Sequence, residues 1–235
     1  MHVEPIQIYL SGALIILFLL VTVLVLRKSR NIVNSTFAFT TLMFTLSTVI
    51  GLIHDLTFDI VLPQLISINI LDITGDIVFL LAPLGLFYSS YIIIKGYEAW
   101  LSNIIIFMTI LYLLIGIVLL SNGCTSDSIS CGMSLNYYEV TDITRGLFNL
   151  VITIPLGLSL YYFGKLFSRM KLPNRNSIIL LETGIGVGTV GQIYNSAFIL
   201  LGQGTQILGL LIIVVGVFFA ALSFSNIFAE KIEIK

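Results

Sequence analysis

Long apolar stretches alternate with short polar segments along the chain, and seven of the stretches are long enough to cross a membrane. A helix needs ~20 mostly apolar residues to span the hydrocarbon core of a bilayer. The apolar runs are continuous rather than alternating, which argues against a transmembrane β-barrel. The predicted spans are residues 8–26, 32–53, 73–94, 101–120, 147–167, 178–201 and 207–228. An alternative start for the third span lies earlier, just after Pro63.

These spans predict an all-α fold: a single polytopic domain over residues 1–235, built as a seven-helix transmembrane bundle. The composition agrees, because 57% of the residues are hydrophobic and only 10% are charged. A soluble domain usually carries about 25% charged residues. The chain therefore lacks the polar side chains that would cover a water-exposed surface.

The positive charges predict the orientation, since Lys and Arg accumulate in cytoplasmic loops. With the N-terminus outside, all but one of the 11 basic residues fall on the cytoplasmic side, and only Arg145 falls outside. The basic cluster Arg27, Lys28 and Arg30 follows the first span instead of preceding it, which excludes a secretory signal peptide. We therefore expect a multi-pass protein of the cell membrane with a cytoplasmic C-terminus.

The two cysteines, Cys124 and Cys131, lie in the predicted outer loop between the fourth and fifth spans. The compartment outside the membrane permits disulfides, so we expect these residues to form one. The alternative is a copper(I) site in which Met133 joins the two thiolates, because soft sulfur ligands suit that ion. No histidine lies nearby, so we predict the disulfide and neither a metal site nor a cofactor.

Two acidic residues lie at the outer end of the third span, and ionisable residues at membrane depth are candidate functional sites. Asp76 lies about one helical turn inside the outer face, and Asp72 lies one turn earlier on the same helix face. Together they would form a mouth that attracts cations. The simpler interpretation is an ion pair between Asp76 and Arg145, which lies at the start of the fifth span.

A polar stripe runs along the sixth span, and such a stripe must face protein or water. Gly184 and Gly188 in the same span form a small-xxx-small pair that lets a neighbouring helix approach closely. The stripe therefore predicts either a ligand pocket or water path, or ordinary helix packing, which we prefer. At the α-helical period its members are Glu182, Thr189, Gln192 and Ser196.

No internal repeat is evident, since the Gly-rich sixth span has no counterpart among the first three spans. Many transporters are built from repeats, so this observation weakens a transporter interpretation.

Seven spans with an outer N-terminus resemble the microbial rhodopsins in layout. Those proteins bind retinal on a Lys in the middle of the seventh helix, and residues 207–228 contain no Lys, which excludes a retinal protein. The chain also resembles the seven-helix sensory region that precedes prokaryotic histidine kinases. Its first span ends in Arg27-Lys28-Ser29-Arg30, a second span with small residues follows directly, and the third span contains a central Pro83. No kinase or cyclase module follows, so the resemblance implies a stand-alone member with no catalytic residues to carry over.

We therefore expect a non-enzymatic integral membrane protein, either a receptor-like signalling sensor or an accessory subunit of a membrane complex. Its expected partners are the lipid bilayer and other membrane proteins or copies of itself, and nucleic acid is not among them. The alternative is a small cation or solute transporter or channel, with Asp72, Asp76 and Glu182 on its path. A membrane enzyme would need a metal cluster or paired carboxylates, and Asp76 and Glu182 lie near opposite membrane faces.

Overall fold

The computed structural model describes residues 5–28, 31–60, 66–96, 98, 101–121, 142–168, 175–201 and 207–227. Within these ranges it contains seven helices that are long and apolar enough to cross a membrane. The predicted all-α fold is thereby confirmed for the described residues, and the seven helices match the seven predicted spans. Their length and composition are those of a multi-pass membrane protein. The helices are α1 (Pro5–Lys28), α2 (Ile32–Ile60), α3 (Ile66–Lys95), α4 (Asn103–Ser121), α6 (Asp142–Phe167), α7 (Arg175–Leu200) and α8 (Ile207–Ile227).

Several helices are longer than the apolar runs that predict them. On the predicted outer side, α2 continues to Ile60, α3 starts at Ile66 and α6 starts at Asp142. Hydropathy marks only the part of a helix that crosses lipid, whereas backbone hydrogen bonds can continue beyond the membrane. We name the two ends of the bundle outer and inner, following the predicted orientation.

Local signals explain where individual helices begin and end. Asn31 caps α2, because its side-chain Oδ1 accepts a hydrogen bond from the backbone N–H of Asn34 at 2.8 Å. α3 stops at Gly96, whose φ of 90° lies in the left-handed region that favours glycine. The Gly96 N–H donates to the carbonyl of Ile92 at 2.9 Å, so the end of α3 is satisfied internally.

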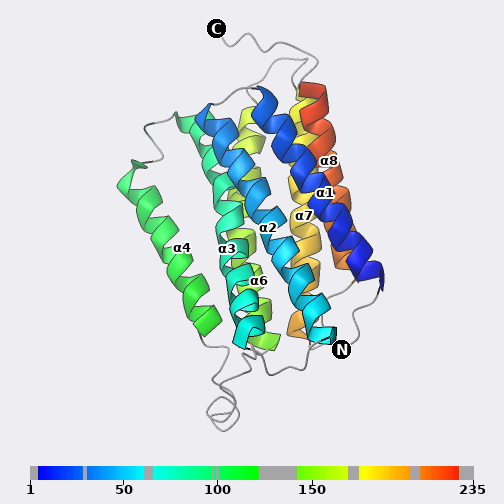
Figure 1. Ribbon diagram of the computed structural model, residues 1–235. Coiled ribbons are helices and arrows are strands. Elements are labelled where there is room, and N and C mark those ends of the chain that lie inside the picture. Colours follow the sequence, from blue (N-terminus) through cyan, green and yellow to red (C-terminus); the bar gives the residue numbers. More distant parts are fainter. Residues whose placement is uncertain are drawn as a thin grey trace.

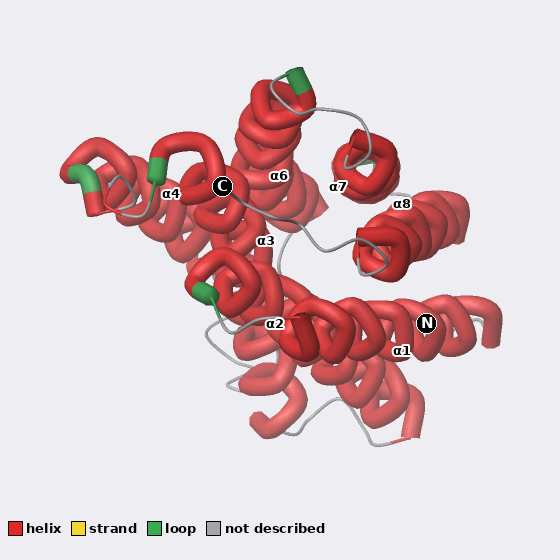
Figure 2. The backbone as a smooth tube through the Cα atoms, turned by 90° about the horizontal axis from the view of Figure 1, so that it is seen from above, coloured by secondary structure: helices red, strands yellow, loops and turns green. Residues whose placement is uncertain are grey.

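Six of the helices form a closed ring, seen end-on in Figure 2. Around this ring α1 packs on α2, α2 on α3, α3 on α6, α6 on α7, α7 on α8, and α8 returns to α1. Helix α4 lies outside the ring, where it packs against α3 and α6 (Figure 1). The ring follows chain order, and only the excluded α4 interrupts the sequence.

Two polar contacts attach α4 to α3. The Tyr112 hydroxyl donates a hydrogen bond to the Leu80 carbonyl at 2.8 Å, and the hydroxyls of Tyr88 and Thr109 lie 2.6 Å apart. Elsewhere α4 exposes large apolar side chains such as Ile104. Such side chains suit contact with lipid tails, so α4 resembles a helix on the lipid-facing edge of a bundle.

Helices α7 and α8 pack backbone against backbone. A Cβ atom added to Gly216 would lie 2.5 Å from the backbone nitrogen of Gly188, and one added to Gly184 would lie 2.6 Å from the Gly216 carbonyl oxygen. Only glycine fits at such distances. This is the close approach that the spacing of Gly184 and Gly188 predicts.

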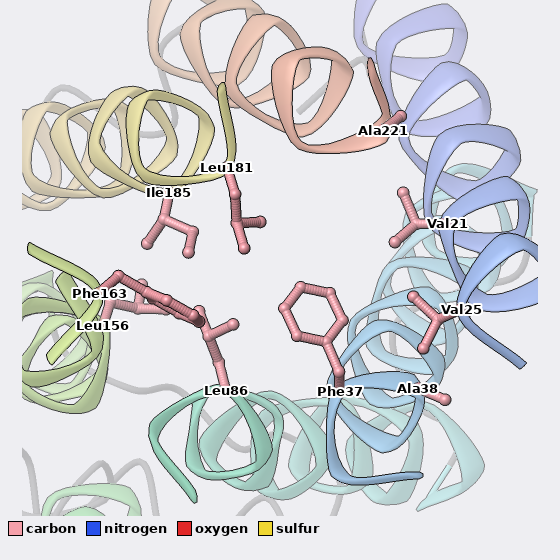
Figure 3. Close-up of a cluster of buried hydrophobic side chains, with 10 residues drawn as sticks. All are labelled: Val21, Val25, Phe37, Ala38, Leu86, Leu156, Phe163, Leu181, Ile185 and Ala221. Carbon is pink, nitrogen blue, oxygen red and sulfur yellow. The ribbon is translucent and has the colours of Figure 1, made fainter. Parts of the chain in front are cut away.

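Ten buried apolar side chains fill the inner half of the ring, and all six ring helices contribute to them (Figure 3). Most belong to the inner ends of their helices, as Val25 near the end of α1 and Phe163 near the end of α6 illustrate. We call this cluster the apolar seal. Its members are Val21, Val25, Phe37, Ala38, Leu86, Leu156, Phe163, Leu181, Ile185 and Ala221.

Candidate functional site

The ring encloses a central cavity of about 330 Å³, and all six ring helices line it. This volume lies at the lower end of the range of ~300–1,000 Å³ found for small-molecule sites. The apolar seal closes its inner end, since five residues belong to both the seal and the cavity wall. These shared residues are Val21, Phe37, Leu86, Leu156 and Ile185.

Most of the polar side chains of the cavity wall lie in its outer part. Ser11 and Arg145 lie within about two turns of the outer ends of α1 and α6, and Asn195 lies within two turns of the outer end of α7. The hydroxyl, charged and amide side chains that line this part come from five of the six ring helices. They are Ser11, Thr48, Asp76, Arg145, Asn149, Gln192 and Asn195.

Two of these amides are hydrogen-bonded across the α6–α7 interface. The Gln192 Nε2 donates to the Asn149 Oδ1 at 3.0 Å, and Gln192 is buried. Each amide side chain has two donor hydrogens and two acceptor lone pairs, and this bond uses one group from each. The pair therefore keeps further hydrogen-bonding capacity at the cavity wall.

An aromatic wall faces these polar groups from α1, α2 and α3. Phe18 stacks on Phe44 with ring centroids 5.3 Å apart, and Phe44 meets Phe79 edge-to-face at 5.8 Å. All three line the cavity. The cavity thus joins an apolar surface to a polar one, an arrangement typical of sites that orient an amphipathic ligand.

The structure brings part of the predicted charged site together. Asp76 and Arg145 line the same cavity from the adjacent helices α3 and α6. Asp72 belongs to α3, but its side chain lies outside the described part of the structure. The predicted two-carboxylate mouth therefore remains an expectation, whereas the approach of Asp76 and Arg145 to one cavity is an observation.

The polar stripe of α7 divides between the cavity and helix packing. Thr189 and Gln192 line the cavity. Ser196 is fully buried, and its hydroxyl donates to the Gln192 carbonyl at 2.7 Å. Glu182 lies against α6 near the inner end, where its Oε1 is 3.1 Å from the position of a Cβ on Gly164. The polar face of α7 therefore lines the cavity at Thr189 and Gln192 and takes part in helix packing at Ser196 and Glu182.

Sequence reasoning passed over six polar residues of the cavity wall, namely Ser11, Thr40, Thr41, Thr48, Asn149 and Asn195. Each is uncharged, so it perturbs the hydropathy of its span much less than a carboxylate does. The available signal is the amide itself, because an Asn buried in an apolar span needs a hydrogen-bonding partner.

The predicted disulfide and its copper(I) alternative fall on Cys124, Cys131 and Met133, which lie outside the described residues. Within the described ranges, no three His, Cys, Asp or Glu side chains gather in a way that could hold a metal ion.

Comparisons of the chain with protein-family models, with curated proteins and with solved structures found no match. The class of protein therefore rests on the fold and the site: a multi-pass membrane protein with a six-helix ring around a central cavity.

Proposed function

We propose that this protein is a non-enzymatic, receptor-like membrane protein that binds a small zwitterionic solute with an apolar side chain. The observation that carries the proposal is the two-sided wall of the central cavity. Asp76, Arg145 and the Gln192–Asn149 amide pair line its outer part, and the aromatic rings of Phe18, Phe44 and Phe79 form an apolar wall. A carboxylate and a guanidinium on one wall complement a ligand that has an ammonium and a carboxylate group.

The apolar seal supports binding rather than open passage. Ten apolar side chains from all six ring helices close the inner end of the cavity. Moving an ion through such a region without polar partners is costly. A solute that enters from the outer side would therefore bind above the seal, and its contacts with several helices could alter their relative positions.

Signalling would then require a partner on the inner side or within the membrane, either another membrane protein or a second copy of the chain. A role as an accessory subunit needs the same surfaces but no solute. Ligand binding therefore discriminates between these two roles, since only the receptor needs the cavity to be occupied.

A thermal-stability measurement on the full chain in lipid nanodiscs tests the proposal. The probes are leucine, 3-methylbutylamine and 4-methylpentanoate, which share one apolar group and carry respectively both charges, the cation alone and the anion alone. A ligand at 100 times its dissociation constant stabilises the folded state by ~2.7 kcal/mol. We expect leucine to raise the melting temperature more than either singly charged probe.

Gln192→Leu should remove much of the leucine effect because it deletes an amide of the cavity wall. Thr109→Val is the matched control, since it removes the contact with Tyr88 at the α3–α4 interface, away from the cavity. Equal effects of the three probes, or no effect of leucine and other apolar amino acids, would refute the proposed ligand class.

A further inference from the structure

The six-helix ring divides into two similar halves. We define the first half as α1, α2 and α3, and the second half as α6, α7 and α8. The most extensive interfaces are α7–α8 and α2–α3, followed by α6–α7 and α1–α2, and the least extensive are α3–α6 and α1–α8. The first two pairs in this order each contain one interface from each half. The last pair contains the two interfaces that join the halves.

The positions that line the cavity repeat between the halves. On α1 and α6, three of the lining residues of each helix form pairs that lie 134 residues apart, whereas Val21, Asn149 and Leu156 have no such partner. These pairs are Ser11 with Arg145, Leu14 with Phe148, and Phe18 with Ile152.

The same spacing of 134 residues relates α3 to α8, where it pairs Asp76 with Leu210, Phe79 with Ile213, and Leu86 with Ala220. The helical period lets α1 and α6 match at other spacings as well, and 134 residues is the one that they share with α3 and α8. The second helices, α2 and α7, match at a different constant spacing, as Phe37 with Ile185 and Thr41 with Thr189 show.

The excluded helix α4 explains how the halves can be parallel. Successive spans alternate in direction, so a second set of three would be inverted if it followed the first directly. One additional crossing by α4 restores the direction, and α1 and α6 run the same way (Figure 1). Parallel repeats related by an axis along the membrane normal occur in transporters, whose substrate sites lie between the repeats.

We infer that the two halves move relative to each other and expose the central cavity alternately to the two sides, so that the protein carries its solute across the membrane. This inference extends the proposed function, because it uses the same cavity and the same solute class. The first half and the second half are the moving bodies, and the interfaces α3–α6 and α1–α8 are the seams between them.

Hydrogen bonds and close backbone contacts join the helices within each half. In the first half, the hydroxyls of Thr22 and Thr41 lie 2.7 Å apart between α1 and α2, and those of Thr36 and Ser89 lie 2.7 Å apart between α2 and α3. In the second half, the Gln192–Asn149 bond joins α7 to α6, and the glycine contacts join α7 to α8. Motion at the seams would leave all of these contacts intact.

Aromatic contacts close both sides of the division toward the inner end. Tyr91 of α3 meets Tyr162 of α6 edge-to-face, with ring centroids 5.2 Å apart. Phe37 of the first half meets Phe224 of the second half at 4.7 Å. These contacts would separate when the cavity opens toward the inner side.

The charged groups of the cavity also belong to different halves. Asp76 is on α3 of the first half and Arg145 is on α6 of the second half. A zwitterion held by both would bridge the seam. The solute would therefore bind most tightly when the two halves lie at one particular distance from each other. A ligand can shift a conformational equilibrium only if it binds the two conformations with different affinities.

Cysteine accessibility tests this inference, because the measurement follows the cavity itself and needs no solute. In a full-length background with Cys124→Ser and Cys131→Ser, Leu156→Cys places a thiol where the cavity wall meets the apolar seal. An impermeant thiol reagent is applied to right-side-out or inside-out membrane vesicles. Ile154→Cys is the control, because Ile154 lies on the same helix but is exposed on the surface of the bundle and does not line the cavity.

Alternate exposure predicts that Leu156→Cys reacts from both sides, at least tenfold faster than Ile154→Cys. Thr189→Cys, at another position of the cavity wall, repeats the measurement should Leu156→Cys fold poorly. A reversible lock is then added: Tyr91→His with Tyr162→His, bridged by Zn²⁺. We expect zinc to abolish the reaction from the inner side but not from the outer side, and chelation of the zinc to restore it.

The outcomes separate this inference from the proposed function. Reaction from the outer side alone would overturn carriage and leave a binding cavity. Reaction from both sides that zinc does not alter would indicate a continuous pore, which overturns alternating exposure. Reaction from neither side would contradict both the binding cavity and the carrier.

Discussion

The side chain of Gln192 on α7 donates a hydrogen bond to Asn149 on α6 at 3.0 Å, and both residues line the central cavity. The contact joins two helices at the depth where the wall changes from polar to apolar. It therefore contributes both to helix packing and to the surface that a solute would meet.

Gln192→Leu should destabilise the protein by ~1 kcal/mol and weaken solute binding about tenfold. Interhelical hydrogen bonds in membranes contribute ~0.6 kcal/mol on average, and the Asn149 amide would lose its partner. The double variant Asn149→Leu with Gln192→Leu should regain stability but not binding, because it leaves no orphaned amide. Reversible unfolding in mild detergent together with leucine titration measures both quantities. A double variant as unstable as the sum of the single variants would contradict this account.

Gly216→Ala should separate α7 from α8. The new methyl group would lie 2.5 Å from the Gly188 nitrogen, and overpacking of this kind typically costs ~1–3 kcal/mol. Gly157→Ala on α6 is the matched control, since no atom lies within 4 Å of its added Cβ and alanine favours helix. Melting temperatures should fall for the first variant and hold or rise for the second. Similar melting temperatures would show that α7 and α8 are less closely packed than the structure indicates.

Glu182→Gln should leave solute binding unchanged. Glu182 lies against Gly164 of α6 and is absent from the cavity wall, so its side chain serves helix packing near the inner end. We expect a change in thermal stability of no more than ~1 kcal/mol, in line with the contributions of interhelical polar contacts. Leucine binding to this variant is the measurement. A tenfold loss of affinity would place Glu182 in the solute site and return the alternative of a cation or solute path along α7.

The orientation of the bundle is open to a direct measurement. In the background without native cysteines, Asn122→Cys should react with an impermeant thiol reagent applied to intact cells, and Ser29→Cys should react only after the membrane is opened. The reason is the excess of Lys and Arg on the predicted cytoplasmic side. The reverse labelling pattern would show that the bundle has the opposite orientation, with the apolar seal toward the outside.

Sequence patterns predict the helices of this protein well, because a helix that crosses a membrane needs a long apolar run and hydropathy measures such runs directly. The span predicted over residues 207–228 matches α8 closely. Where α2 extends to Ile60, the additional turns leave the apolar stretch and are not predicted by it. The start of α3 at Ile66 agrees with the alternative start just after Pro63. The close packing at Gly184 is also predictable, because the spacing of small residues fixes the face they share.

The cavity is much harder to predict from sequence. Helical periodicity places Thr189, Gln192 and Ser196 on one face, but it cannot tell which of them meets a neighbour and which meets a void. Asn149 gains its role only because it lies opposite Gln192 across the α6–α7 interface, and the periodicity of either helix alone does not give this register. The similarity of the two halves is equally hidden, since it resides in the register of lining positions and in packing rather than in shared residues.

The apolar seal also has a consequence for the cell that carries the protein. An ion that crosses it would have to shed its hydration shell between side chains such as Phe37 and Leu156, which offer no replacement oxygen atoms. A membrane could therefore hold many copies of the chain and still maintain its resting voltage. Shortening side chains of the apolar seal should allow ions to flow through the protein and so lower the resting voltage of the membrane.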